Sequence, residues 1–559
     1  MKWIICLVLL LSIVGHAQIA QWIHRYPGYG PSGAYDIAVD NAGNVYVAGW
    51  GAYPSRSADF LIIKYNDAGD TLWVRYYDGG ADFYDYATAL AVDDSGNVYV
   101  TGRSIASGSD YDIATMKYNS AGVEQWVTRY NGPANSDDEG NDIVLDDAGN
   151  VYVTGVASAT PGAHYITIKH ESTGDTAWTA LYGGPDGMGC VANALALDAS
   201  GNVYVTGNGF SLSTADDFAT VKYNSQGDEE WAATYNGLTT YADDTAYDIE
   251  VVSGYIYVTG ASDNASFNPD CFTIKYNSAG DTLWTARYDG PGNAYDRGYA
   301  LDVDDSGNVF VTGVSFDTYT QSDYMTIKYN SSGLMDWEAR YNGPDSAGDQ
   351  ASAIVRDSQG NIYVTGRSYA YGTYTPEYDY LTVKYNSSGV EQWNARYDGT
   401  GHTQDYAHAI AVDNAGYVYI TGESIGNTSY EDVVTIKYTT TGVKEDAGYT
   451  AQKAGFNLTA SPNPFHHSTK IRYSILNTGC VEEELRNANF EMRKHTLKIY
   501  DAAGRLVKDF FLPTTYYLLP TAVSWDGTDQ SNCQLGSGVY FLRLEVGDYH
   551  EMQQLLLVR

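Results

Sequence analysis

Apolar and polar side chains alternate in short runs along this chain, and the runs recur at a nearly fixed interval. The clearest run is Asn97–Gly102, with the sequence NVYVTG, whose alternating Val and Tyr are typical of a β-strand. Related copies are separated by 52, 53 or 56 residues, which indicates a repeat architecture. The copies end at Gly49, Gly102, Gly155, Gly207, Gly260, Gly313, Gly366 and Gly422.

Each repeat contains the pattern of four short strands. In one unit an alanine-rich run at 87–93 precedes the NVYVTG strand, and further strands are predicted at 112–118 and 124–130. Four antiparallel strands in about 50 residues, repeated eight times, predict an all-β fold, an eight-bladed β-propeller of four-stranded blades. Alanine suits the centre, where blades converge, and tryptophan suits the rim. The fourth strands carry Trp22, Trp73, Trp126, Trp178, Trp231, Trp284, Trp337 and Trp393.

The order of the strands predicts how the ring closes. The strand containing Trp22 precedes the first alanine-rich strand, and no tryptophan strand follows the run that ends near Tyr438. We therefore expect the last blade to take its outermost strand from residues 21–26, which would leave no open sheet edge in the ring. An open solenoid is the alternative, but it would not need this offset.

The charge of the chain excludes one class of partner. Asp and Glu outnumber Lys and Arg by 69 to 32, for a formal net charge of −37. Such a surface repels phosphate backbones, so we expect no binding to nucleic acid. Cations and carbohydrate hydroxyls remain compatible with it.

The N-terminus predicts export. Residues 1–17 combine Lys2, an apolar run and the small residues Gly15 and Ala17, which is typical of a secretory signal peptide. We expect no transmembrane segment in the mature chain. Of the later cysteines, Cys480 and Cys533 could pair, whereas Cys190 and Cys271 are predicted to be buried thiols.

Aspartate recurs just before the first strand of six units and at the start of the third strand in seven. By strand direction both sets lie on one face of the disc, the mouth, where carboxylates could bind a ligand or collect Ca²⁺. The alternative is structural, because Asp at a strand start accepts hydrogen bonds from loop amides. No other cofactor is suggested. The candidate ligand-binding residues are Asp85, Asp138, Asp244 (with a one-residue slip), Asp296, Asp349 and Asp405.

An arginine three residues after the tryptophan recurs in five units. The third unit lacks both this Arg and the third-strand Asp, holding Leu181 and His164 instead, which favours an Asp–Arg pair within each blade. No pattern typical of a catalytic residue is present. The predicted structural pairs are Asp112 with Arg129, Asp270 with Arg287, Asp323 with Arg340, Asp379 with Arg396, and Asp432 with Arg25.

The segments AVDxxGNVYVTG and DYxTIKYNxxG resemble the bacterial β-propeller repeats known as SBBP, from about residue 18 to 441. After a predicted linker at 442–454 the pattern changes. SPNPF, LKIYDAAGRLV, VSWDG and GSGVYFLRLEVG, in this order within 455–559, resemble the type A C-terminal sorting domain of the type IX secretion system. That resemblance implies a small Ig-like β-sandwich, the type IX machinery as partner, and an extracellular or outer-surface location.

Three functions remain open on the sequence. The leading hypothesis is a secreted or cell-surface binding or adhesion protein, not an enzyme, whose ligand is a glycan or a surface protein. An extracellular polysaccharide lyase or glycosidase on the same scaffold is the first alternative. A passive structural component of the surface is the second.

Overall fold

A computed structural model describes most of the 559-residue chain. The described residues are 20–52, 57–80, 83–106, 110–238, 243–317, 321–343, 347–371, 376–426, 430–439, 456–461, 468–475, 496–501, 505–510, 521–530, 533–546 and 549–558. The chain divides into two compact units, Met1–Lys444 and Glu445–Arg559. The predicted signal peptide and linker lie outside the described residues. No helix in the described ranges is long and apolar enough to cross a membrane.

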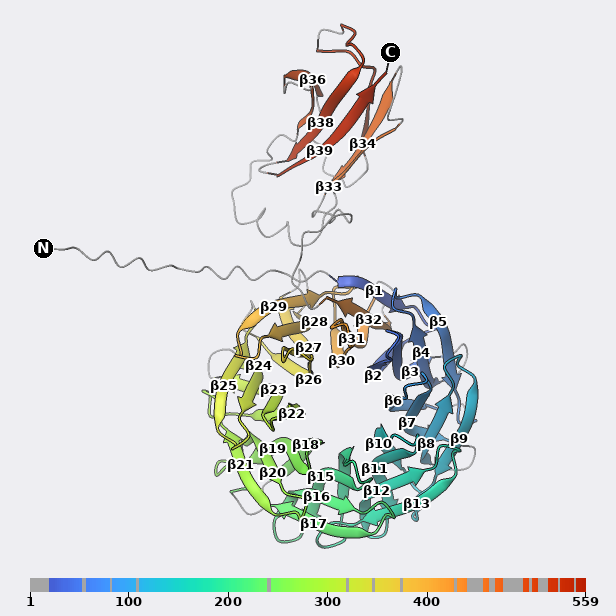
Figure 1. Ribbon diagram of the computed structural model, residues 1–559, viewed down its shortest axis with the longest axis vertical. Helices are drawn as coiled ribbons and strands as arrows, with labels where there is room; N and C mark the ends of the chain where they lie inside the picture. The colour runs from blue at the N-terminus through green and yellow to red at the C-terminus, as the bar shows by residue number, and fades with distance from the viewer. Residues whose placement is uncertain are drawn as a thin grey trace, which may run out of the picture. The chain divides into compact units, whose positions relative to one another are not determined.

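The first unit is a ring of eight four-stranded antiparallel sheets, which confirms the predicted eight-bladed propeller (Figure 1). In blades 1 to 7 the strands follow chain order from the centre to the rim. Blades 1 and 2 comprise β2 (Ser32–Val39), β3 (Val45–Ala52), β4 (Ala58–Tyr65), β5 (Thr71–Tyr77), β6 (Tyr86–Val92), β7 (Val98–Ile105), β8 (Tyr111–Tyr118) and β9 (Glu124–Tyr130). Blades 3 and 4 comprise β10 (Glu139–Leu145), β11 (Val151–Ala159), β12 (Gly162–His170), β13 (Thr176–Tyr182), β14 (Cys190–Leu197), β15 (Val203–Ser211), β16 (Ala215–Tyr223) and β17 (Glu229–Tyr235). Blades 5 and 6 comprise β18 (Asp244–Val252), β19 (Tyr255–Asp263), β20 (Pro269–Tyr276), β21 (Thr282–Tyr288), β22 (Asp296–Val303), β23 (Val309–Asp317), β24 (Gln321–Tyr329) and β25 (Met335–Tyr341). Blade 7 comprises β26 (Asp349–Arg356), β27 (Ile362–Tyr371), β28 (Pro376–Tyr385) and β29 (Glu391–Tyr397).

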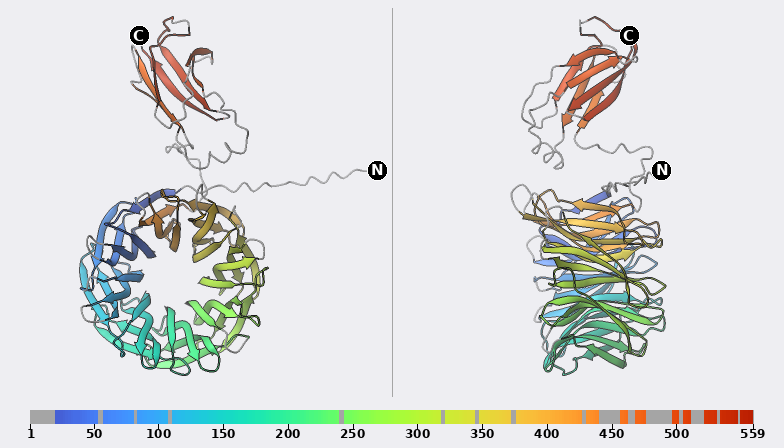
Figure 2. Two further views of the ribbon diagram at one scale, coloured as in Figure 1. Left: turned by 180° about the vertical axis from the view of Figure 1, so that it is seen from behind. Right: turned by 90° about the vertical axis from the view of Figure 1, so that its left-hand side faces the viewer.

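Blade 8 joins the two ends of the propeller. Its sheet order is β30 (Asp405–Val412), β31 (Val418–Ile425), β32 (Glu431–Tyr438) and then β1 (Ala20–Tyr26) at the rim (Figures 1 and 2). Trp22 pairs with Lys437, and Tyr26 pairs with Val433. The predicted closure by the N-terminal strand is therefore confirmed.

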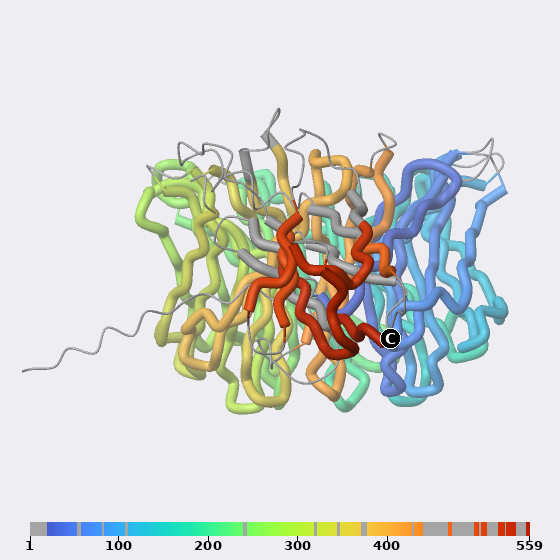
Figure 3. The backbone as a smooth tube through the Cα atoms, turned by 90° about the horizontal axis from the view of Figure 1, so that it is seen from above, coloured from blue at the N-terminus to red at the C-terminus, as the bar shows by residue number. Residues whose placement is uncertain are grey.

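The strands run between the two faces of the ring (Figures 2 and 3). One face, which we call the mouth face, carries the connections from second to third strands and from each blade to the next. The opposite face carries the turns between first and second strands and between third and fourth strands. We call the eight first strands around the axis the hub.

Every hub strand contains a bulge, and the bulge explains the glycine of the NVYVTG pattern. In blade 2 the register shifts between Ala87 and Ala89, so that Thr88 is the extra residue. The shift brings the carbonyl oxygen of Tyr86 so close to Gly102 that a Cβ atom there would overlap it. The equivalent glycine of each other blade faces the same obstacle. This position therefore requires glycine because of its neighbouring strand.

The tryptophans join neighbouring blades at the rim. The indole N–H of Trp73 donates to the carbonyl of Ser120 in the next blade at 3.2 Å, and its ring covers Gly122 there. Seven of the eight tryptophans make this bond, to a carbonyl 45 to 50 residues further along the chain. The rim position predicted for tryptophan is confirmed, and its contact across the blade boundary explains why a large ring is needed there.

We expect Gly227→Ala to destabilise the propeller more than Gly201→Ala. Both glycines have positive φ, +87° and +76°, so both substitutions strain the backbone by about 1 kcal/mol. A methyl group at Gly227 would lie 2.6 Å from Cδ2 of Trp178, whereas at Gly201 its nearest neighbour is 3.6 Å away. Overpacking should add about 1 to 3 kcal/mol at Gly227, measured by urea unfolding. Equal losses would show that the tryptophan contact tolerates the methyl group.

His170 departs from the repeat at a buried position. The other blades hold tyrosine there, as at Tyr118. Its ring nitrogens lie 3.4 Å from the hydroxyl of Thr128 and 3.2 Å from that of Thr176, and burial lowers its pKa to about 4. The folded state therefore favours neutral histidine.

We expect His170→Tyr to reduce the acid sensitivity of the fold. Above pH 6.5 the titration of His170 does not lower the free energy of unfolding, because its imidazole is neutral in both the folded and the unfolded state. As the pH falls from 6.5 towards 4, the unfolded chain binds the proton first, and about 2 to 3 kcal/mol of stability is lost. The urea midpoints at pH 7 and 4.5 should lie closer together in the variant. His402→Gln is the control: Asp398 raises the pKa of this exposed imidazole, so its removal should not narrow the gap. An unchanged gap in the tyrosine variant would contradict this account.

The second unit contains two small sheets. One has the order β33 (Phe456–Ser461), β34 (Thr469–Ile475) and β37 (Thr521–Trp525), and the other β36 (Leu506–Phe510), β35 (Thr496–Asp501), β38 (Gly538–Val546) and β39 (Tyr549–Leu557). Side chains from both sheets form one buried cluster, including Ile471, Trp525 and Leu542, as in a β-sandwich. Cys533 is an exposed free thiol, and Cys480 lies outside the described residues. Cys190 and Cys271 are buried free thiols, as predicted.

Candidate functional site

The six mouth carboxylates are buried and bonded to the backbone of their own loops. Asp85 accepts hydrogen bonds from the N–H groups of Gly79, at 3.0 Å, and Ile105, at 2.8 Å. Each fixes a connection between blades, and four of the six also accept a hydrogen bond from the end of a second strand. All six are at most 1% exposed: Asp85, Asp138, Asp244, Asp296, Asp349 and Asp405.

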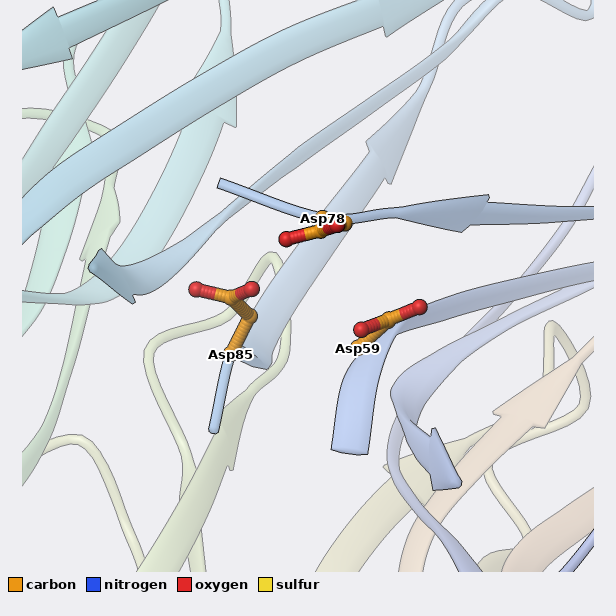
Figure 4. A group of neighbouring side chains, drawn as sticks. All are labelled: Asp59, Asp78 and Asp85. Carbon is orange, nitrogen blue, oxygen red and sulfur yellow. The ribbon is translucent and has the colours of Figure 1, made fainter. Parts of the chain in front are cut away.

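The two predicted sets of aspartates meet at three blade boundaries. In the group of Figure 4, Asp59 begins a third strand, Asp78 follows a fourth strand and Asp85 begins the next blade. Within each group one carboxylate oxygen per residue lies within 4.8 Å of the others, a spacing compatible with a cation such as Ca²⁺. The other two groups are Asp270 with Asp289 and Asp296, and Asp379 with Asp398 and Asp405.

Burial shifts the titration of these carboxyls. It raises the pKa of Asp296 and Asp405 to about 6 and that of Asp379 to about 7, against the opposing effect of their hydrogen bonds. In the last two groups an arginine already neutralises the third-strand carboxylate. A cation there would compete with that ion pair.

The five predicted Asp–Arg pairs are ion pairs in the structure. Arg129 shows their shared pattern: it contacts Asp112 at 3.0 Å, donates to the Ser104 hydroxyl at 2.8 Å and also donates to the Ser104 carbonyl. Each arginine thus ties the third strand of its blade to the end of the second. The N–O distances are 2.9 Å for Arg25–Asp432, 3.1 Å for Arg287–Asp270, 2.8 Å for Arg340–Asp323 and 2.8 Å for Arg396–Asp379.

One cross-strand pair beside the hub bulge differs from blade to blade. Its first-strand member comes directly before the buried Ala or Gly of that strand, as Tyr86 comes before Ala87. Its second-strand member directly follows the glycine of the NVYVTG pattern, as Arg103 follows Gly102. The residues next to this pair are nearly the same in every blade, whereas the two residues of the pair differ in size and charge from blade to blade. From blade 1 to blade 8 the pairs are Gly33–Trp50, Tyr86–Arg103, Glu139–Val156, Val191–Asn208, Thr245–Ala261, Arg297–Val314, Gln350–Arg367 and Tyr406–Glu423.

In five consecutive blades these pairs form a continuous chain of contacts, which we call the axial arc. Arg103 contacts Glu139 of blade 3 at 3.3 Å. The rings of Tyr86 and Trp50 lie 6.1 Å apart across the boundary of blades 1 and 2. At Gly33 a Cβ atom would lie 2.6 Å from a carboxylate oxygen of Glu423 and 2.7 Å from Nε1 of Trp50. Glycine therefore lets side chains from blades 8 and 1 meet.

Bulge residues extend the axial arc in blades 1 and 8. The rings of Tyr35 and His408 lie 5.6 Å apart, and His408 lies 3.7 Å from Glu423. Burial raises the pKa of Tyr35, and the carboxylate of Glu423 raises it further, so the phenol stays protonated at neutral pH. Burial also raises the pKa of Glu139, against the effect of Arg103.

Two arginines of the axial arc lie against pairs of tyrosine rings. The guanidinium carbon of Arg103 is 5.1 Å from the ring centre of Tyr86 and 4.8 Å from that of Tyr111. Arg367 has the same relation to Tyr378, at 5.0 Å, and Tyr406, at 5.2 Å. Such contacts hold the flat cation in a defined orientation.

Trp, Tyr and Arg are the residues that most often dominate binding energy, and in the axial arc they remain partly exposed. A further Arg–Tyr group, Arg297 with Tyr247 and Tyr299, lies in blades 5 and 6. Sequence reasoning missed the arc because it compared what the repeats share. The signal that could have found the arc is a pair of positions whose residues differ in every blade.

On the opposite face, an open depression of about 550 Å³ lies between blades 1 and 2, lined by Asp40, Asn44, Lys64, Asp94 and Ser120 among others. Its lining consists of turn residues and the strand residue Lys64, all at positions that recur around the ring. It therefore does not distinguish one blade from another.

Fold and repeats define the class: this is an eight-bladed β-propeller with a small C-terminal β-unit. Residues 72–108, 125–162, 340–372 and 394–428, four segments within the propeller, match the family described as SBBP, beta-propeller repeat. An uncharacterised WD repeat-containing protein of Acanthamoeba polyphaga mimivirus is 24% identical over 478 residues, 65% of this chain and 31% of that protein. The chain thus spans about a third of that relative.

Several solved structures are similar at low identity. PorZ, described as an essential bacterial surface component of the type IX secretion system of Porphyromonas gingivalis, is 12% identical over 96% of this chain and 100% of its own, with a TM-score of 0.19. The WD40 domain of SCAP from fission yeast is 12% identical over 75% and 98%, with a TM-score of 0.38. A PL25 ulvan lyase is 12% identical over 67% and 97%, with a TM-score of 0.33. None of these similarities specifies a ligand or a reaction.

Proposed function

We propose that this protein is an exported, surface-displayed or secreted binding protein whose axial arc binds a glycan. The observation that supports this most is the variable cross-strand pair, which differs in every blade and collects Trp50, Tyr86, Arg103 and Glu423 on one side of the hub. Aromatic rings offer flat apolar faces, and the nearby charged groups can hydrogen-bond hydroxyls, a combination typical of small-molecule sites. The buried mouth aspartates then act as supports for the loops around the arc.

Export is the second part of the proposal, and the C-terminal unit supports it. The motifs that resemble a type IX sorting domain coincide with strands: LKIYD with β35, AVSW with β37 and GVYFLRLEV with β38. We infer that this unit directs the chain through the type IX machinery to the cell surface. The variable part of the propeller would then face the extracellular medium.

We expect Tyr35→Ala with Tyr84→Ala to weaken glycan binding about tenfold per ring, roughly 1.4 kcal/mol each. Tyr35 is 37% exposed and Tyr84 is 52% exposed, stacked on Tyr86, so their removal should leave the fold intact. Ligands would be selected by applying the full-length mature chain to a glycan array, with and without Ca²⁺, and measured by calorimetry. Tyr255→Ala, at a 41% exposed ring on the opposite face, is the matched control.

Two outcomes would contradict glycan binding at the arc. One is the absence of any glycan ligand under both conditions. The other is equal loss of affinity in the arc variant and in the Tyr255→Ala control. Release of shorter saccharides from a bound polysaccharide would instead favour the lyase or glycosidase alternative.

We expect deletion of residues 456–559 to leave the propeller in the periplasm of a bacterium that has a type IX system. The full chain should reach the outer surface, as measured by protease accessibility on intact cells. In a strain without a working type IX system the full chain should also remain in the periplasm. Surface exposure of the truncated chain would rule out the sorting role.

A further inference from the structure

Arg367 is a charged group that the fold orients without neutralising. It lies on β27 in blade 7, partly exposed, with its guanidinium against the rings of Tyr378 and Tyr406. Its Nη2 donates to the side-chain oxygen of Gln350 at 2.8 Å. Among the described residues, no Asp or Glu forms an ion pair with it. In blade 8, Glu423 lies instead beside His408.

Arg103 shows what a complete version of this arrangement contains. It contacts two tyrosine rings of its own blade, Tyr86 and Tyr111, and Glu139 from the next blade supplies a carboxylate at 3.3 Å. At Arg367 the next blade supplies Tyr406, which occupies the position that Glu139 occupies beside Arg103. The two sites therefore share the cation and one ring position, held by Tyr111 or Tyr378, whereas the position of the Glu139 carboxylate is occupied by a tyrosine in the Arg367 site.

We propose that Arg367 binds an anionic group of the ligand, so that the glycan bound by the axial arc is an acidic one. This inference rests on the proposed function and specifies its ligand class. Tyr378 and Tyr406, whose ring centres lie 5.8 Å apart, both contact the guanidinium, which has five N–H donors. Those N–H groups match the two oxygens of a carboxylate or sulfate. The rings also reduce hydration of the cation, which strengthens the pairing.

The net charge of −37 does not oppose this assignment at the arc itself. At physiological ionic strength, charges further than about 8 Å away are largely screened. The mouth aspartates are buried and bonded to loop amides, and five third-strand aspartates are paired with arginine. A local cation can therefore select an anionic group within an acidic protein.

A purely structural role for Arg367 is the alternative, since the cation also joins blades 7 and 8. The test must therefore neutralise Arg367 without removing it. Gln350→Glu does this, because its carboxylate would occupy the place of an amide that already accepts a hydrogen bond from Arg367. Gln392→Glu, on an exposed part of β29, makes the same charge change away from the arc and is the matched control.

The experiment compares acidic and neutral probes on the full-length mature chain. The carboxylate pair is oligogalacturonate and its methyl ester, and the sulfate pair is a sulfated galactan oligosaccharide and its desulfated form. We expect the wild type to prefer the acidic member of at least one pair by tenfold or more. Gln350→Glu and Arg367→Gln should both remove that preference while keeping the affinity for the neutral member. Arg367→Lys should keep part of it, and Gln392→Glu all of it.

A gain-of-function variant completes the design. Glu139→Gln frees Arg103, and we expect it to increase the preference for the acidic probe severalfold. Thermal unfolding of each variant checks that the fold is retained. Equal binding of acidic and neutral probes by the wild type, or an unchanged preference in Gln350→Glu, would overturn the anion site while leaving glycan binding intact. Failure to bind any of the four probes or any other glycan would overturn both.

Discussion

Convergence of the blades on one axis is the constraint on which the rest of this structure depends. Next to the bulge the first strands carry small buried side chains, such as Ala34, Ala87 and Ala192, whereas many of their larger side chains are partly exposed. The same crowding appears within each blade, where the bulge brings a carbonyl onto the glycine of the second strand. The large tryptophan side chains lie at the rim, where they join each blade to the next. At the positions buried between blades, side-chain size therefore increases from hub to rim.

This constraint is why so much of the fold could be predicted. A fixed interval, a small-residue strand and a tryptophan strand determine the blade, and the position of Trp22 ahead of the first alanine-rich strand determines the closure. Local pattern was insufficient wherever the cause lies in another strand. The glycine of NVYVTG looks like the end of a strand, although the carbonyl of Tyr86 is what requires it. His170 likewise reveals its buried setting only through the neighbouring blade, which supplies Thr128.

The candidate site was harder to predict for a related reason. Recurring aspartates attracted attention because they recur, yet the structure buries all six first-strand carboxylates and bonds them to loop amides. Recurrence in a repeat protein is more often the signature of a shared structural task. The axial arc lies where the repeats disagree, and its members come from opposite ends of the sequence. Only the ring brings Gly33, Trp50 and Glu423 together.

Blade 8 gives the axial arc an unusual dependence on the two chain ends. The arc runs through blades 7, 8, 1, 2 and 3, so it includes the blade that β1 closes. A ligand that contacts both sides of this closure would add a further connection between the two ends of the propeller. Conversely, loss of β1 would remove the outermost strand of the blade that holds Tyr406, His408 and Glu423. Ligand binding and closure of the ring would thus depend on the same blade, and damage to β1 would impair both.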